Sequence, residues 1–368
     1  MTDSLPRIAI VGAGGFLGSR LIEAWYLGGH IRPVAIVRRP PSMARFARFP
    51  IEWKIADANN STALANAISG CDGVVHATIA SPLEIIASAR SFGEALKSTG
   101  VARAVYLSTA LVHGPAPDKD FDESTPFDQR QDSDYGLAKI QAEKTLSEVA
   151  LPGLVKLRPG IVYGPRSRWI SDTASAAQKG TLAWINGGNA ICPAIYVDNL
   201  IHAIECALTA PLAAVSSDRA YLVRDTEEVR WNQFYRTIVD YCMGPDLEIP
   251  EGRVSARPSR LSRRLENLRV HPRSQAALAH VPNSWKQAVK GAIQGFKGTQ
   301  VPAGTEGALR GISKPSPSLS IEMADLQRNQ AVMIDRRAHQ NLGYAPPVSF
   351  TEGMVRSLEW LKFTGMIR

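Results

Sequence analysis

The feature that most constrains the fold is a glycine-rich turn close to the N-terminus, between a short apolar segment and a helical one. The turn reads Gly12-Ala-Gly-Gly-Phe-Leu-Gly18 and follows residues 7–11, a β-branched run with the composition of a buried parallel strand. After the turn, apolar residues recur at helical spacing through residue 25. This order of strand, turn and helix predicts the first unit of a parallel α/β sheet.

Each glycine of the turn has a separate task in such a unit. Gly12 permits the tight turn, Gly15 lets backbone amides approach a pyrophosphate, and Gly18 lets the helix pack closely on the strand. The anion then lies at the helix N-terminus, where the amides are unpaired and the helix dipole favours negative charge. We therefore predict that a dinucleotide binds at Gly12, Gly15, Phe16, Leu17 and Gly18, with a purely structural turn as the alternative.

A tyrosine and a lysine further along the chain point to proton and hydride chemistry. Tyr135 and Lys139 stand in the segment Asp134-Tyr-Gly-Leu-Ala-Lys139, four residues apart and therefore on one face of a helix. An ammonium beside a phenol favours the phenolate and lowers the pKa of the phenol from about 10. Tyr135 can then exchange a proton with a carbonyl or an alcohol.

Together with further segments, these motifs resemble the extended short-chain dehydrogenase/reductases, a group that includes NAD(P)-dependent epimerases and dehydratases. The spacing Gly12-x-x-Gly15-x-x-Gly18 is typical of the extended branch, and the other matching segments are residues 72–77, 105–114, 158–165, 196–200 and 342–346. The likeness covers most of the chain. It implies an α/β fold, a Rossmann-type doubly wound parallel sheet with a smaller, interleaved C-terminal substrate domain.

The resemblance also implies how the domains divide. Residues 1–165, with about 194–225, are expected to form the NAD(P)-binding domain, and residues 166–193 and 226–368 the substrate domain. A ligand belongs in the cleft between them, outside the carboxyl ends of the strands. At 368 residues and 45% hydrophobic, the chain can bury a large core.

Composition gives expectations about location and redox state. No apolar run approaches the length that spans a bilayer, and the N-terminus enters a strand almost at once, so we expect a cytoplasmic protein. The 4 cysteines lack CxxC spacing, which predicts reduced core thiols and neither a disulfide framework nor a metal site.

Catalytic roles follow from the resemblance, residue by residue. Thr109 occupies the position of the catalytic Ser or Thr, where its hydroxyl holds the substrate oxygen beside Tyr135. Ser108 is the neighbouring alternative and is also expected at the cofactor. Lys139 is expected to bind the nicotinamide ribose while it tunes Tyr135.

Other positions are expected to contact the dinucleotide. Asp57 and Ala58 correspond to the adenine contact, although an ordinary turn aspartate is a live alternative for Asp57. His76 and Ala77 are expected to line the dinucleotide, His76 by packing rather than by proton chemistry. Backbone groups near the nicotinamide are expected from Pro159, Gly160 and Ile161.

The end of the second predicted strand indicates the cofactor. NAD enzymes generally place an acid there to hold the ribose diol, whereas residues 34–37 run into Arg38 and Arg39. Two guanidinium groups can clamp an adenosine 2′-phosphate through planar, charge-assisted hydrogen bonds. NADP(H) is therefore the preferred cofactor, and NAD(H) stays possible. The alternative interpretation is that one or both arginines are solvated surface charges.

Departures from the family narrow the reaction. Ala110 and Leu111 stand where sugar-nucleotide 4,6-dehydratases carry an Asp-Glu pair, and Ile161 replaces the Asn of many epimerases. Residues 192–195 contain no cation for a substrate pyrophosphate, although Arg166, Arg168 and Lys179 could supply cations from elsewhere. We therefore expect an NADP(H)-dependent oxidoreductase that reduces a carbonyl or oxidises an alcohol of a small molecule through Thr109, Tyr135 and Lys139. A nucleotide-sugar epimerase is the alternative, and a non-catalytic dinucleotide-binding sensor the minor one.

One stretch looks like a basic insertion in the substrate domain, at about residues 250–320. Ten Lys and Arg residues and a single acid lie between residues 253 and 297, in a chain of net charge +8. Ser284 and the apolar stripe after it predict a basic amphipathic helix, followed by a long loop. We expect its apolar face to pack on the protein, with peripheral membrane contact through about 253–297 as the alternative. No nucleic-acid motif is present, and a homodimer stays open.

Overall fold

The structure, a computed structural model, describes residues 5–149, 151–255 and 317–367. The chain divides into two compact units, Met1–Arg253 with Pro317–Arg368, and Val254–Ser316. The fold described below is that of the first unit. The basic amphipathic helix, most of the loop after it, and the membrane contact assigned to them lie outside the described residues.

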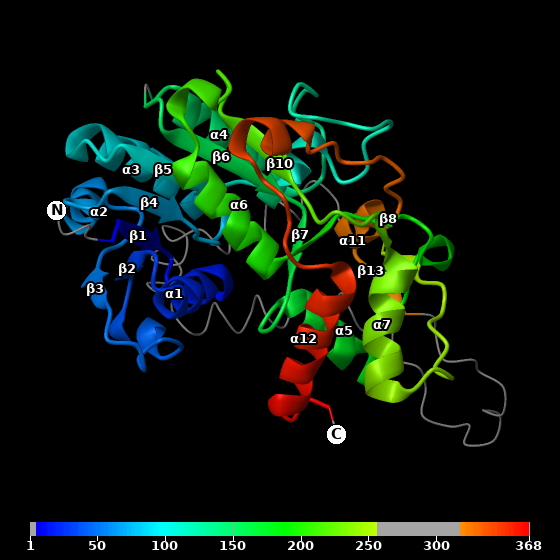
Figure 1. The fold of residues 1–368 in the computed structure, drawn as a ribbon. Coiled ribbons are helices and arrows are strands. Elements are labelled where there is room, and N and C mark those ends of the chain that lie inside the picture. The colour runs from blue at the N-terminus through cyan, green and yellow to red at the C-terminus, as the bar shows by residue number, and fades with distance from the viewer. Residues whose placement is uncertain (1–4, 150, 256–316, 368) are drawn as a thin grey trace, which may run out of the picture. The chain divides into compact units, whose positions relative to one another are not determined.

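A seven-stranded parallel sheet forms the centre of this unit, in the order β10-β6-β5-β4-β1-β2-β3 (Figure 1). The strand order reverses at β1, which pairs with β2 on one side and β4 on the other, so a crevice is expected at the carboxyl ends of these strands. The predicted doubly wound fold is confirmed. The strands are β1 Arg7–Val11, β2 Arg32–Val37, β3 Glu52–Ile55, β4 Gly73–His76, β5 Arg103–Leu107, β6 Leu154–Pro159 and β10 Ala220–Val223.

Helices cover the sheet on both faces. Along β1, Ile8 and Ile10 pack with helices α1 (Phe16–Gly28) and α6 (Val197–Thr209), while Ala9 and Val11 face the opposite way. That other face is covered by α2 (Ser61–Ile68), α3 (Pro82–Thr99) and α4 (Asp134–Ser147). Because both faces are buried, the central strands are apolar without alternation, as residues 7–11 predicted.

Smaller elements pack around a further apolar cluster that includes Tyr163, Trp231 and Phe234. Contacts group them with the sheet in one unit, and the boundaries expected for a separate substrate domain stay a prediction. The strands of this part are β7 Ile161–Tyr163, β8 Ile191–Cys192, β9 Ala194–Tyr196, β11 Val229–Arg230, β12 Arg253–Val254 and β13 Ser318–Leu319. Its α-helices are α5 Arg168–Gln178, α7 Trp231–Met243, α11 Ile321–Leu326 and α12 Phe350–Phe363.

Five short helical turns complete the described elements, namely η1 Pro40–Met43, η2 Ala110–His113, η3 Asn186–Gly188, η4 Leu212–Ala214 and η5 Ala338–Leu342. All of the cysteines are free thiols, with Cys71 and Cys192 buried. Within the described ranges, no helix has both the length and the apolar character that crossing a bilayer requires.

Candidate active site

A cleft of about 450 Å³ lies where β1, β2, β4, β5 and β6 end. Residues far apart in the sequence meet here because the carboxyl ends of parallel strands share one edge of a sheet. The cleft brings together most of the residues expected at the site: Gly12, Gly15, Phe16, Leu17, Arg38, Asp57, Ala58, Ala77, Ser108, Thr109, Tyr135, Lys139, Pro159 and Gly160.

The glycines of the first turn differ in what requires them. Gly12 has φ +89°, and a Cβ there would lie 2.8 Å from the carbonyl oxygen of Ala77. A Cβ on Gly18 would overlap the carbonyl oxygen of Gly12, so helix α1 can approach the strand only without it. Gly15 has an ordinary φ of −73°, and a Cβ there would meet only the Gly12 oxygen, at 3.2 Å. The fold therefore requires Gly12 and Gly18, while Gly15 keeps the wall of the cleft open.

Helix α1 begins at this wall with no group to neutralise its positive end. Gly15 is the N-cap and offers no side-chain cap, and the first turn contains no acid. The amides of Phe16, Leu17 and Gly18 have no acceptor inside the helix because they precede its first hydrogen-bonded turn. These features fit the pyrophosphate of a nicotinamide dinucleotide.

The two arginines after β2 take different positions. Arg38 lines the cleft, and its guanidinium Nη1 lies 3.7 Å from Glu84 Oε1. Arg39 is exposed and outside the cleft, because it is the N-cap of η1, where the chain turns away. Of the two arginines, the structure places Arg38 in the cleft, and the clamp by both stays a prediction. Ser42, which sequence reasoning missed, lines the cleft with Arg38.

Two other expected cofactor contacts lie behind the wall of the cleft. The His76 ring is buried and packs against Tyr106, with ring centres 5.2 Å apart; burial lowers the pKa of His76 to about 3, with the charge of Lys139 as a smaller cause. The Ile161 amide donates to the carbonyl oxygen of Pro193 at 2.7 Å, so it is not free for the nicotinamide. These residues pack the site rather than line it.

The structure is compatible with both interpretations of Asp57, the adenine contact and the ordinary turn aspartate. It lines the cleft, and its Oδ1 also accepts hydrogen bonds from the Asn59 amide at 3.0 Å and the Asn59 side chain at 3.2 Å. The turn aspartate is thus also a cleft residue.

The hydroxyl groups of Ser108 and Thr109 are not equivalent. Ser108 Oγ donates to Glu143 Oε1 at 2.5 Å, and Glu143 is itself buried in an ion pair with Arg158. Thr109 Oγ1 accepts from the Leu111 amide at 3.2 Å, which leaves its own proton free to donate into the cleft. The geometry therefore favours Thr109 over Ser108 as the group that can hold a substrate oxygen.

Tyr135 and Lys139 lie in the first turns of α4, which Ser133 caps by accepting from the Gly136 amide at 3.2 Å. The Lys139 ammonium lies 5.8 Å from the centre of the Tyr135 ring. It donates to the carbonyl oxygen of Leu107 at 2.6 Å, which anchors it at the end of β5. Both side chains line the cleft beside Thr109.

Burial decides the protonation of this pair, contrary to the expectation that Lys139 lowers the pKa of Tyr135. Burial raises the pKa of Tyr135 to about 12, and the charge of Glu322 adds to this rise. Burial lowers the pKa of Lys139 to about 8, which Glu143 partly opposes. Desolvation penalises the charged form of each group and is the largest cause of both pKa shifts. The raised pKa favours the protonated phenol of Tyr135 at neutral pH.

Glu322 is a residue of the site that sequence reasoning missed. It lies in α11, and its Oε1 accepts from the Ser133 hydroxyl at 2.8 Å, so it reaches the N-cap of helix α4 from 189 residues away. No local pattern signals such a contact. The next residue, Met323, lines a separate hollow of about 370 Å³, together with Trp169, Leu182 and Tyr235.

Comparison with known proteins agrees with this geometry. Residues 8–223 match the family model described as the NAD dependent epimerase/dehydratase family. Over 267 residues, the chain is 26% identical to the 3 beta-hydroxysteroid dehydrogenase/Delta 5-->4-isomerase of Mycobacterium tuberculosis, which covers 66% of this chain and 71% of that protein.

A second relative and a solved structure extend the comparison. The N-acetyl-alpha-D-glucosaminyl-diphospho-ditrans,octacis-undecaprenol 4-epimerase of Escherichia coli O157:H7 is 25% identical over 215 residues, 54% of this chain and 62% of the epimerase. DesIV, a dTDP-glucose 4,6-dehydratase from Streptomyces venezuelae solved with NAD, has the same fold with a TM-score of 0.67 and 15% identity, covering 98% of this chain and 99% of DesIV.

Exchanging two glycines for alanine should separate ligand binding from folding. Gly15→Ala should leave the melting temperature nearly unchanged and weaken dinucleotide binding at least about tenfold, because its methyl group narrows the wall of the cleft. Gly18→Ala, the matched control, should lower the free energy of unfolding by about 1–3 kcal/mol through overpacking. Calorimetric titration and thermal unfolding measure the two effects; equal dinucleotide affinity in Gly15→Ala and the unmodified protein would contradict the role of Gly15.

Proposed function

Because the chain belongs to the NAD dependent epimerase/dehydratase family, we propose that it reduces the carbonyl group of a small, largely apolar molecule with NADPH. Relatives in this family are NAD(P)-dependent oxidoreductases, epimerases and dehydratases, and the chain is an enzyme of this extended group. The observation that carries the proposal is the cleft that Tyr135, Lys139 and Thr109 line together, with the Thr109 hydroxyl proton free to donate.

The residues of the cleft suit carbonyl reduction. When bound, the reduced nicotinamide supplies a hydride to the carbonyl carbon. Thr109 and Tyr135 hold the carbonyl oxygen, and Tyr135 transfers its phenolic proton to that oxygen as negative charge develops there. Lys139, held by Leu107, stabilises the phenolate that remains until it regains a proton from solvent.

The residues expected near the substrate support an apolar molecule. Residues 192–195 contain no cation for a substrate pyrophosphate, and Ile161 offers no polar side chain. The resemblance to a hydroxysteroid dehydrogenase favours the same class of substrate.

Epimerisation of a sugar nucleotide is the second candidate, favoured by the epimerase among the relatives. Such an enzyme oxidises its substrate and then returns the hydride to the opposite face. Its cofactor is therefore not consumed, which distinguishes the two reactions directly.

The first test is NADPH consumption with a panel of apolar ketones and aldehydes. We expect one NADPH to be oxidised per product formed, and Tyr135→Phe to lower kcat by about 10²–10⁴ while the dissociation constant for NADPH changes less than about twofold. The variant removes the proton donor and little else. Retained cofactor without net oxidation, together with strong thermal protection by a UDP- or dTDP-sugar, would establish the epimerase instead.

The activity should also depend on the charge of Lys139. With a pKa of about 8, the ammonium is present below that pH and lost above it, so kcat should fall by up to about tenfold per pH unit above pH 8. The guanidinium of Lys139→Arg stays charged over this range, so kcat of this variant, where activity is retained, should fall less steeply above pH 8. Initial rates at saturating NADPH between about pH 6 and pH 10 measure the profile. A rate independent of pH over that range would show that the lysine charge is not needed.

Substitution of the two adjacent arginines tests the preference for NADP(H) over NAD(H). Arg38→Ala should raise the dissociation constant for NADPH about tenfold and leave that for NADH nearly unchanged, because Arg38 lines the cleft. Arg39→Ala makes the same charge change outside the cleft and should have little effect on either constant. Equal affinities of the unmodified protein for NADPH and NADH would rule out the preference for NADP(H).

A further inference from the structure

A second hollow, of about 420 Å³, lies away from the cofactor cleft, between the C-terminal half of α4 and strand β6. Helices α2, α3 and α4 cover this face of the sheet as far as β6. Toward β10, the covering layer includes the loop at residues 123–127 and the turn at residues 217–219, which line the hollow. We call this hollow the β6 pocket.

Strand geometry aims two cations into the β6 pocket. Successive side chains of a strand alternate between its faces, so Leu154, Lys156 and Arg158 share one face, while Val155 and Leu157 pack in the core on the other. Lys156 is 6% exposed and Arg158 is 4% exposed. A charge buried this far on an interior strand requires compensation.

Arg158 has that compensation. Its Nη2 lies 2.6 Å from Glu143 Oε2, its Nε donates to Glu143 Oε1 at 2.9 Å, and its Nη1 contacts His113 Nε2 at 3.1 Å. The hydrogen-bonding groups of the Glu143 carboxylate and the Arg158 guanidinium are therefore largely paired with each other.

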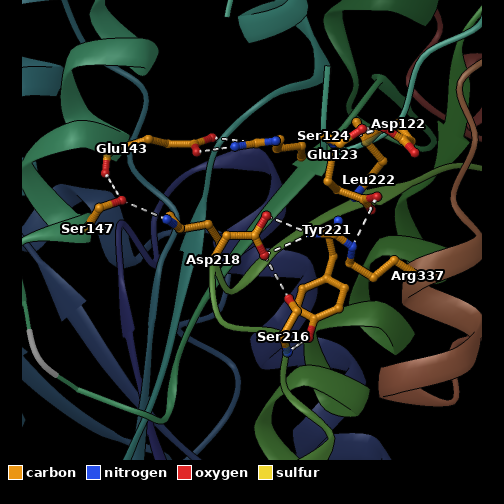
Figure 2. Close-up of polar contacts among 12 residues, drawn as sticks. Asp122, Glu123, Ser124, Glu143, Ser147, Ser216, Asp218, Tyr221, Leu222 and Arg337 are labelled. Atoms are coloured by element: carbon orange, nitrogen blue, oxygen red, sulfur yellow. Dashed lines mark hydrogen bonds and ion pairs between the residues drawn. The ribbon is translucent and has the colours of Figure 1, made fainter. Parts of the chain in front are cut away.

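The other two carboxylates of the β6 pocket are also partnered. Figure 2 shows Arg337 between Asp218 and Glu123, with Nη1 2.6 Å from Asp218 Oδ2 and Nε 3.5 Å from Glu123 Oε2. Glu123 Oε1 further accepts from the Leu222 amide at 2.8 Å. These acids are held by groups at the rim and do not pair with Lys156.

Lys156 has no such partner. Its ammonium can donate three hydrogen bonds, and the one it makes among the described residues is to the Ser147 hydroxyl, at 2.9 Å. The charges around it are Glu143 and Asp218, which favour the ammonium, and Arg158 and Arg219, which oppose it. No carboxylate of the described residues is within ion-pair distance of it, so a buried cation keeps two donors for a ligand.

Arg219 adds a second cation at the mouth of the β6 pocket. Its Nη1 donates to the Leu151 carbonyl oxygen at 2.7 Å, and its backbone has φ +53°, which is uncommon for a residue with a side chain. Its own carbonyl oxygen accepts from the Lys156 amide at 2.7 Å, which places the two residues on adjoining backbone segments.

We propose that the β6 pocket binds a small oxyanion, a free phosphate or the phosphate group of a small ester, with Lys156 as its principal ligand and Arg219 as its second. The ligand supplies the acceptors that Lys156 lacks in the protein. The volume of the pocket exceeds the needs of a bare phosphate, so an ester with a small polar substituent also fits.

Calorimetric titration tests this site with two probes, inorganic phosphate and glycerol 3-phosphate. Saturating NADPH is present throughout, so that the amides at the glycine turn are occupied. We expect one saturable site for at least one probe, an affinity at least about tenfold lower in Lys156→Met, and an affinity within about twofold of the unmodified protein in Lys144→Met. Lys144 is an exposed lysine of α4, the helix beside β6, and lies outside the pocket, so it controls for the loss of one charge.

Thermal unfolding separates a binding role from a structural one. Without phosphate, Lys156→Met should melt at the same temperature as the unmodified protein or higher, because a buried charge has been removed. At about 10 mM phosphate, the unmodified protein should gain stability and the variant should not. A lower melting temperature of the variant in the absence of phosphate would indicate a structural lysine and overturn the proposal.

Two further results would also overturn it. One is equal phosphate affinity in Lys156→Met and the unmodified protein, and the other is the absence of saturable binding of both probes up to about 50 mM. Binding of glycerol 3-phosphate without binding of inorganic phosphate would identify the ligand as an ester. None of these measurements depends on turnover, so they are independent of the proposed reduction.

Discussion

A buried ion pair between Glu143 and Arg158 ties helix α4 to strand β6, and much of the site depends on it. Glu143 is 1% exposed, and breaking such a pair by removing one partner typically costs about 3–5 kcal/mol. The same carboxylate accepts a hydrogen bond from the Ser108 hydroxyl, which leaves Thr109 as the hydroxyl of the cleft that is free to donate. It also opposes the effect of burial on Lys139. One carboxylate thus ties helix α4 to the sheet and influences the protonation of Lys139.

The same pair lies between the cofactor cleft and the β6 pocket. On the side of the cofactor cleft, Ser108 and Lys139 are held by Glu143 and by the end of β5. On the other side, Arg158 is satisfied by Glu143 and His113, so the unpartnered donors belong to Lys156. Arg158 and Lys156 differ because strand alternation places both cations on one face of β6, where α4 supplies a single carboxylate, Glu143. Arg158 forms the ion pair with this carboxylate, and Lys156 does not.

The fold and the core of the site follow from local sequence patterns. The apolar run before Gly12, the turn itself and the helical spacing after it depend on steric rules that act within a few residues, and they predicted the position of β1 and α1. Tyr135 and Lys139 share a helix, so their common face could be read from their spacing alone. These predictions succeed because the steric rules and the helical spacing behind them act within a few residues of the sequence.

Tertiary structure decided what local patterns cannot contain. Whether Arg38 or Arg39 reaches the cleft depends on where η1 turns the chain, and the contact between Glu322 and Ser133 joins residues 189 positions apart. The protonation of Tyr135 was likewise decided by packing, because desolvation depends on everything that surrounds a group, whereas spacing describes only one neighbour. The sequence by itself determined the parallel sheet, the dinucleotide turn and the face shared by Tyr135 and Lys139. The folded chain determined which hydroxyl is free, which arginine lines the cleft, and which buried lysine of β6 has no ion pair among the described residues.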